Sequence, residues 1–227
     1  MKKIYKILVF FIIIFIPIST LAHVQHYEDL NRIEFDIYRN NKHIGNHIFT
    51  FKKIDNQTLV ESEINFEINK LGVVLYRYNV KGVEVYEDNK LIKFNSKTNQ
   101  NGKEKYVNLS LENDGYIIDG SSYKGKAPLD YQLGTWWNHS IVDSIAQISA
   151  VSGRIIKQKV TFLGKETVKF GNIEFEALHF NFSSIDESLS KDKKLNTDVW
   201  YDEKTLNWVK ASFKKKGDWE YRLVSID

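Results

Sequence analysis

The feature that most constrains the fold of this chain is a period-two alternation of apolar and polar side chains. It is clearest over residues 60–68, where Val60, Ile64, Phe66 and Ile68 share one face and acidic or amide side chains occupy the other. Successive side chains of a β-strand point to opposite faces, so this pattern predicts a strand with one buried and one solvated face. Such strands are typical of antiparallel sheets.

Turn signals divide most of the chain into short strands. Asn101-Gly102 and Asp114-Gly115 are dipeptides that favour two-residue hairpin turns. Further strands are expected over residues 33–38, 106–111, 156–163, 166–170, 173–182, 199–201, 206–213 and 219–224. The sequence therefore predicts an all-β fold, in which a single strongly curved antiparallel sheet of about a dozen strands forms a half-barrel or open barrel.

A long apolar stretch over residues 73–88 changes its alternation near Gly82. Tyr76, Tyr78 and Val80 lie on one parity, whereas Val83 and Val85 lie on the other. A β-bulge or sharp bend at the glycine would return both groups to the same face. We expect such a bulge or bend here.

The alternation stops between residues 121 and 153. This segment contains Pro128 and the Trp136-Trp137 pair. Apolar residues from Ile141 to Ile148 then recur with the spacing of a helix. The expected structure is a loop followed by one short helix that lies across the opening of the curved sheet.

Residues 1–22 have the features of a signal peptide. A basic start precedes an apolar run from Ile7 to Ile16, and small residues at Thr20 and Ala22 suit cleavage after Ala22. An uncleaved anchor helix is the alternative, but the run is short for a bilayer core about 30 Å thick. We expect a single β-rich domain over residues 23–227, without a stable membrane span after cleavage. Its expected location is the bacterial periplasm or the medium.

Composition excludes several classes of site and partner. The chain has no cysteine, which excludes disulfides, cysteine-ligated metal centres and thiol nucleophiles. The formal charge is +3, and three lysines belong to the leader, so the remainder is balanced. This balance argues against a nucleic-acid partner.

No standard catalytic motif is present, so neither catalytic nor metal-binding residues nor a cofactor are predicted. One alternative is copper binding by a new N-terminal His23, assisted by His26, His43 or His47. A polar terminus without metal is the preferred interpretation.

The remaining polar candidates also have ordinary interpretations. We expect His43 and His47 to be solvent-facing turn residues, although a hairpin could bring them together. His179 lies within an apolar strand and is expected to be partly buried. Asp202 is expected to cap a turn. A general-acid role, in a hydrolase that also uses His139, is the alternative.

Aromatic side chains are the best candidates for contact with a ligand. An open, curved sheet can enclose an apolar ligand, and aromatic rings would line such a site. The alternative is a solid core in which these rings simply pack, with the tryptophans anchoring the helix. The candidate ligand-binding residues are Phe66, Tyr76, Tyr78, Trp136, Trp137 and Trp200.

The order of several short motifs resembles a known family. These motifs are Gly45, Leu75-Tyr76-Arg77-Tyr78, Asn101-Gly102-Lys103, Ala127-Pro128, Thr135-Trp136-Trp137-Asn138, Leu163-Gly164 and Val199-Trp200-Tyr201-Asp202. From about Ile33 to Ser225, the chain resembles an uncharacterised family of exported proteobacterial proteins, classed only as a domain of unknown function. The resemblance implies no activity and no catalytic residues.

The pattern is also distantly similar to periplasmic lipoprotein carriers, whose open half-barrels cup a hydrophobic ligand beneath a helical segment. This similarity concerns the fold only. The leading hypothesis is a protein that binds a lipid, an acyl chain or a lipoprotein segment. A structural or partner-binding protein of the envelope, which pairs through exposed sheet edges, is the second. A hydrolase is the third.

Overall fold

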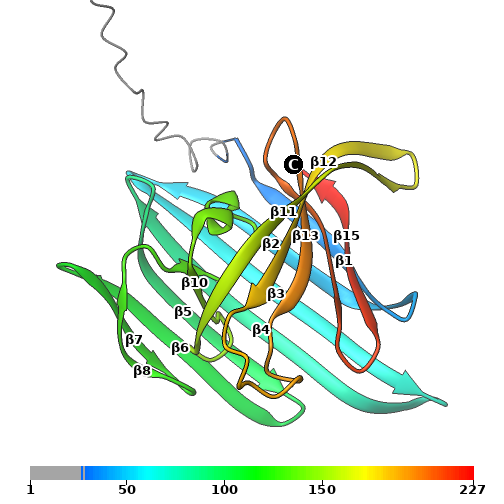
Figure 1. The fold of residues 1–227 in the computed structure, drawn as a ribbon, viewed down its shortest axis with the longest axis horizontal. Helices are drawn as coiled ribbons and strands as arrows, with labels where there is room; N and C mark the ends of the chain where they lie inside the picture. The colour runs from blue at the N-terminus through cyan, green and yellow to red at the C-terminus, as the bar shows by residue number, and fades with distance from the viewer. Residues whose placement is uncertain (1–26, 28) are drawn as a thin grey trace, which may run out of the picture.

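The computed structural model describes Tyr27 and residues 29–227 (Figure 1). The expected signal peptide, its cleavage site after Ala22, and the candidate copper ligands His23 and His26 lie outside the described residues. Within them, no helix is long and apolar enough to cross a membrane.

The protein is all-β, as predicted, and forms one sheet of 15 strands. The only helical element named among residues 29–227 is a short 3₁₀ turn, η2 (His139–Asp143). The strands are β1 (Arg32–Arg39), β2 (Lys42–Ile54), β3 (Gln57–Lys70), β4 (Val73–Glu87), β5 (Lys90–Gln100), β6 (Lys103–Glu112), β7 (Gly115–Gly120), β8 (Lys124–Pro128), β9 (Gln132–Leu133), β10 (Ala146–Ile148), β11 (Ile155–Phe170), β12 (Ile173–Ser184), β13 (Asn196–Asp202), β14 (Trp208–Lys214) and β15 (Asp218–Ile226).

The sheet consists of two meanders joined through the ends of the chain. Its order is β8-β7-β6-β5-β4-β3-β2-β1-β15-β14-β13-β12-β11-β10-β9. All neighbours are antiparallel except the short pair β9–β10. The first described strand therefore pairs with the last, and the two edge strands, β8 and β9, are consecutive in the sequence.

The sheet curls so that its two halves face each other. The turn before β11 reaches β5 and the end of β7, where the Ser96 hydroxyl donates to the Ala150 carbonyl (2.6 Å) and the Ser122 amide donates to the Ser152 carbonyl (2.9 Å). In Figure 1, β11, β13 and β15 cross in front of β2–β6. The inner face of the curled sheet is the face that carries the core.

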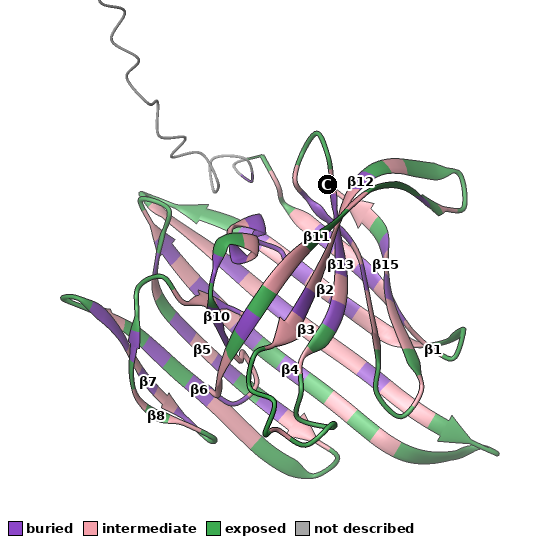
Figure 2. Cartoon of the chain, viewed as in Figure 1, coloured by how far each residue is buried: buried purple, intermediate pink, exposed green. Residues whose placement is uncertain are grey.

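Alternation along the strands produces this core. In β1, Ile33, Phe35 and Ile37 are buried and the residues between them are not. Figure 2 shows burial concentrated in the middle of the strands, with exposed residues at many of the hairpin ends. The element η2 is tied to the core by buried Ile141, and the Ser140 amide donates to the side-chain oxygen of Asn138 (3.0 Å).

The predicted bulge at Gly82 is wrong. The register of β4 shifts instead where it pairs with Asn69 of β3, and again near Tyr86. Even-numbered residues of β4 face inward on both sides of Gly82. A Cβ atom at Gly82 would lie 3.1 Å from the Phe94 ring, so the glycine makes room for that ring. Val83 and Val85 consequently remain half-buried on the outer face.

The segment predicted as a loop and a short helix contains more strand than expected. Only its first part is helical, as η2, whereas Ala146–Ile148 forms β10. All three residues of β10 are buried, because this strand pairs with β9 and β11 and is covered on both faces. Strands β8, β9 and β10 account for much of the difference between about a dozen strands and 15.

Candidate functional site

Five aromatic rings gather on the inner face near one end of the sheet. Phe66 stacks on Tyr78 (4.8 Å between ring centroids) and on Tyr76 (6.1 Å). Trp219 of β15 meets Phe66 edge-on across the interior (5.2 Å) and stacks on Phe213 (5.7 Å). We call these five residues the aromatic cluster. The curl of the sheet creates it, because β3 and β15 are not neighbouring strands.

The aromatic cluster is incompletely buried. Phe66 is 9% exposed, and the other four rings are half-buried, unlike the rings deeper in the core. Tyr76 lies close to the β3–β4 turn and Trp219 to the β14–β15 turn. The cluster is therefore an apolar surface at an open end of the curled sheet.

Trp136 connects this cluster with the deeper core. Its ring lies edge-on to Trp208 (5.8 Å) and Tyr221 (6.4 Å), and the Tyr201 hydroxyl donates to its carbonyl (2.9 Å). The indole nitrogen of Trp136 is buried and has no hydrogen-bond partner within the described part of the chain. Trp136 is half-buried and adjoins the cluster through Tyr221, which contacts Phe213 (6.4 Å).

Trp137 has a different environment, the packed core beneath η2. Its indole nitrogen donates to Glu84 (2.9 Å), and the Tyr86 hydroxyl donates to the second oxygen of the same carboxyl (2.6 Å). Burial raises the pKa of Glu84 to about 7, and the hydrogen bonds from Tyr86 and Trp137 oppose this increase. Trp137 is fully buried against Tyr27 and Phe51, so the structure does not bring it into the aromatic cluster.

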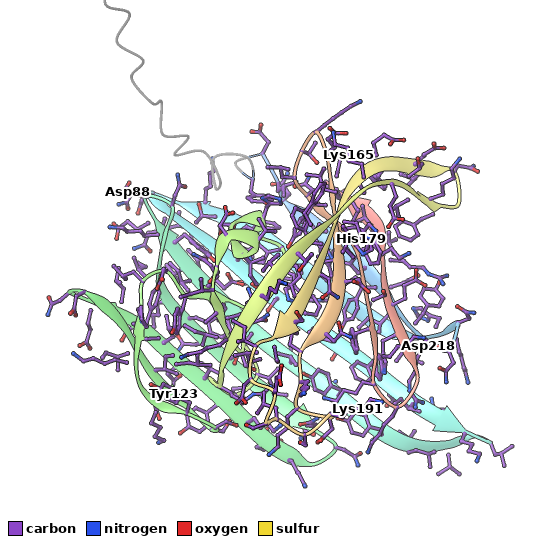
Figure 3. All side chains as sticks on the ribbon, in the orientation of Figure 1. Asp88, Tyr123, Lys165, His179, Lys191 and Asp218 are labelled. Atoms are coloured by element: carbon purple, nitrogen blue, oxygen red, sulfur yellow. The ribbon has the colours of Figure 1, made fainter. Side chains whose placement is uncertain are left out.

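Trp200 faces the opposite side of the sheet. His179 stacks on its ring (4.1 Å), and the Lys210 ammonium lies 4.6 Å from the ring centroid. Figure 3 labels His179 on a strand at the front of the view. Trp200 therefore belongs to the outer face, separated by the sheet from Phe66, Tyr76 and Tyr78.

A polar groove of about 450 Å³ lies on this outer face. Lys210, Glu220 and Arg222 are among its lining residues. Glu220 accepts from Arg222 (2.6 Å) and pairs with Lys210 (3.2 Å). His179 lies between the carboxylates of Glu166 (3.2 Å) and Asp198 (3.4 Å). The basic groups of this region thus already have acidic partners.

The two histidines of the β1–β2 hairpin have different environments. His43 is exposed, as expected, and bonds Asp36 (3.0 Å). The expectation that His47 faces solvent is wrong, because its ring packs on Phe49 (4.2 Å) and near Trp208 (5.9 Å). Burial lowers the pKa of His47 to about 3. Alternation places this histidine on the inner face, where the curled sheet covers it.

The residues of the hydrolase alternative lie apart. Asp202 accepts from the backbone amide (2.9 Å) and hydroxyl (2.7 Å) of Thr205, which confirms its role as a turn cap. His139 packs edge-on to Tyr201 (4.8 Å), the inward-facing neighbour of Asp202. The two candidate groups therefore lie on opposite faces of β13. His179 is partly buried, as predicted, with a side chain 19% exposed.

Sequence reasoning missed a group of cations beside the aromatic cluster. Lys103 and Lys105 of β6 share the parity of buried Val107 and so face inward. Partial burial lowers the pKa of Lys105, and the nearby positive charges of Lys215, Lys103 and Arg154 lower it further. The alternation of β6 was the signal that could have revealed these inward-facing lysines.

Comparisons with known proteins identify a family and a related fold. The sequence matches the domain of unknown function DUF6134 over residues 35–224. No curated protein matches it. A similar solved structure is the crystal structure of a beta-barrel-like protein of domain of unknown function DUF1849 from Brucella abortus. The TM-score is 0.61 at 10% identity, covering 87% of this chain and 98% of the other.

At this level of identity, the likeness to the Brucella abortus protein concerns the fold alone. It agrees with the curled sheet described above. The expected resemblance to a family classed only as a domain of unknown function is confirmed over nearly all of the described chain. The chain belongs to the DUF6134 family.

Proposed function

We propose that this protein binds a hydrophobic ligand, such as a lipid, an acyl chain or a lipoprotein segment, at the aromatic cluster. The observation that carries the proposal is the incomplete burial of these rings on the inner face of the sheet. A chain that only needed a solid core would gain by covering them, since burial of apolar surface stabilises a fold by about 25 cal/mol per Å². Phe66, Tyr76 and Tyr78 of β3 and β4 form one part of the proposed surface, and Phe213 and Trp219 of β14 and β15, which contact Phe66, form the other.

The proposed location is the bacterial periplasm or the medium, after cleavage behind Ala22. The basic and apolar leader supports export. The distant similarity to half-barrels of the lipoprotein-carrier type supports the same kind of ligand, as an analogy between folds.

The edges of the sheet give little support to the partner-binding alternative. Long, flat, apolar edges invite pairing with another chain, whereas short edges with lysine or proline oppose it. The edge strand β8 has only five residues, among them Lys124, Lys126 and Pro128, and β9 has only two residues. The binding hypothesis therefore has the stronger structural support.

Titration with Nile red, an uncharged hydrophobic dye, tests the proposed site. We expect the natively purified protein to bind the dye, and Tyr76→Ser to weaken binding about fivefold, because a stacked aromatic contact contributes about 1 kcal/mol. Tyr106→Ser is the matched control, since Tyr106 is a half-buried tyrosine of β6 whose parity, opposite to that of buried Val107, places it on the outer face. Absence of binding, or equal weakening by both substitutions, would refute this site.

A further inference from the structure

We infer that the hydrophobic ligand carries an anionic head group, which Lys103 and Lys105 bind beside the aromatic cluster. This inference rests on the proposed function and adds the chemical class of the ligand. The ligand would be an amphipathic molecule with its apolar tail on Phe66 and Tyr78 and its carboxylate or phosphate at the two lysines. Arg154 and Lys215, which belong to the facing half of the sheet, would complete the positive surroundings of the head group.

The strand register places the cations next to the rings. Phe66 pairs with Tyr78, Tyr78 pairs with Gln100, and Gln100 pairs with Lys103. Directly paired residues point to the same face, so this row runs across the inner face from an aromatic ring to an ammonium group. Neighbouring strands lie about 4.8 Å apart, which puts the backbone of Lys103 about 10 Å from that of Tyr78. One amphipathic molecule can span that distance.

The next row deeper in the sheet also ends at a lysine. Val80 pairs with Thr98, and Thr98 pairs with Lys105. The Lys105 ammonium donates to the side-chain oxygen of Gln100 (2.6 Å) and is half-buried. The hydroxyl of Thr98 is buried and has no hydrogen-bond partner among the described residues. An unpartnered polar group therefore belongs to Thr98, the cross-strand partner of Lys105 on the inner face.

Lys103, Lys105 and Arg154 lack the acidic partners that similar cations have elsewhere, whereas the charge of Lys215 already acts on Asp192. Lys52 pairs with Glu61 (2.7 Å), and Lys124 pairs with Asp119 (2.8 Å). Within residues 29–227, no ion pair involves Lys103, Lys105, Arg154 or Lys215, and the Arg154 guanidinium bonds only a backbone carbonyl, that of Lys193 (3.2 Å). Because like charges crowd Lys105, an anion bound there would relieve repulsion as well as form charge-assisted hydrogen bonds.

The outer face provides the contrast that makes this arrangement specific. The basic groups along its groove, Lys210 and Arg222, share the carboxylate of Glu220. An anion entering that groove would have to compete with an internal carboxylate. On the inner face, no carboxylate pairs with Lys103 or Lys105 within the described residues, so an anion would meet no such competitor. An amphipathic anion is therefore the ligand that suits this surface.

Three ligands with the same alkyl chain test the inference: dodecanol, dodecanoate and dodecyl phosphate, each titrated into the natively purified protein at low ionic strength. We expect at least one of the two anions to bind about tenfold more tightly than dodecanol, because charge-assisted hydrogen bonds are roughly twice as strong as neutral ones. The anion with the larger gain identifies the head group as a carboxylate or a phosphate. High salt should remove much of this gain without affecting dodecanol.

Lys105→Gln should reduce the affinity for the favoured anion about tenfold and leave dodecanol binding unchanged. Lys97→Gln is the matched control, since Lys97 lies on neighbouring β5 but points to the outer face. Equal affinities for dodecanol and both anions would overturn the head-group inference while leaving the proposed function intact. Equal losses in the two lysine variants would overturn the assignment to Lys105. Failure of all three ligands to bind would refute the proposed function itself.

Discussion

Glu84 carries a carboxyl group in an environment that disfavours its ionised form. Its carboxyl is completely buried beneath η2 and is held by Tyr86 and Trp137. Burial disfavours the charged form and raises the pKa of Glu84 from the usual 4.5 to about 7. The folded protein therefore holds this proton more tightly than the unfolded chain does, and the contribution of Glu84 to stability decreases as pH rises from about 4.5 to about 7.

Glu84→Gln should abolish this decrease, because an amide cannot ionise but retains an oxygen for the Trp137 indole. The variant should gain up to about 3 kcal/mol in unfolding free energy relative to the natural protein between about pH 5 and about pH 8. Urea unfolding of both proteins at the two pH values measures the gain. Parallel changes in the two proteins would show that Glu84 does not control this part of the pH dependence.

His47 acts with the opposite sign over part of the same range. Its pKa is lowered to about 3, so the unfolded chain takes up a proton below about pH 6.5 while the folded protein does not. Its contribution to stability is therefore present above pH 6.5 and decreases as pH falls. Both proteins in the Glu84 experiment contain His47, so the difference between them isolates the carboxyl.

Residue-scale features were only partly predictable from the sequence. Alternation correctly placed Phe66, Tyr76 and Tyr78 on common faces of paired strands. Trp200 and Asp202 share one parity of β13, but the side of the sheet that faces the core depends on the curl of the whole molecule. Glu84 was hidden by apolar Val83 and Val85 next to it, which suggested the opposite inward face.

At the scale of elements, β2 and β3 approach each other closely at Gly45. A Cβ atom there would lie 2.6 Å from the Phe66 Cα and closer still to the Asn65 carbonyl oxygen. These are backbone atoms, which cannot move without separating the two strands. The absence of a side chain at Gly45 therefore allows β2 to lie this close to β3, the strand that carries Phe66.

Gly45→Ala should destabilise the protein by more than about 3 kcal/mol, the upper part of the range for overpacking. Gly82→Ala is the comparison, because its Cβ would meet only side-chain atoms, the Ser62 hydroxyl (2.9 Å) and the Phe94 ring (3.1 Å). That substitution should cost about 1–2 kcal/mol. Thermal or urea unfolding of the two variants ranks them, and equal destabilisation would contradict this account of Gly45.

Long hairpins were predictable, whereas the short strands were not. Alternation and turn dipeptides such as Asn101-Gly102 identify β3 and β6, because each pattern is local. Strand β10 has three residues, all buried, and thus shows no alternation. Its pairing with β9 and β11 is a tertiary feature, which a helix-like spacing of apolar residues over Ile141–Ile148 concealed.

At the scale of the whole molecule, the two ends of the curled sheet carry opposite charge. When the strand residue on each side is counted with the turn, basic residues outnumber acidic ones at the turns β1–β2, β3–β4, β5–β6 and β14–β15. Acidic residues outnumber basic ones in the turns β2–β3, β4–β5 and β6–β7. In Figure 3, Asp218 and Lys191 mark the first end and Asp88 marks the second. The aromatic cluster lies at the basic end, whose field would attract an anion.

The candidate site as a whole depends on the pairing of β1 with β15 and on the curl of the sheet. Phe213 and Trp219 are far from Phe66 in the sequence, and no local pattern indicates that they meet. Arg154 and Lys215 reach the surroundings of Lys105 in the same way. The sequence therefore predicted the part of the site formed by Phe66, Tyr76 and Tyr78, whereas the part formed by Phe213 and Trp219 follows from the topology of the sheet.

The most direct test of the central claim is mass spectrometry of organic extracts from the protein, expressed as the full chain and purified under native conditions. The account predicts an amphipathic molecule with an apolar chain and an acidic head group, present in stoichiometric amount and depleted in the Tyr76→Ser variant. An extract without such a molecule, from protein that also fails to take up Nile red, would contradict the claim that the aromatic cluster is a binding site.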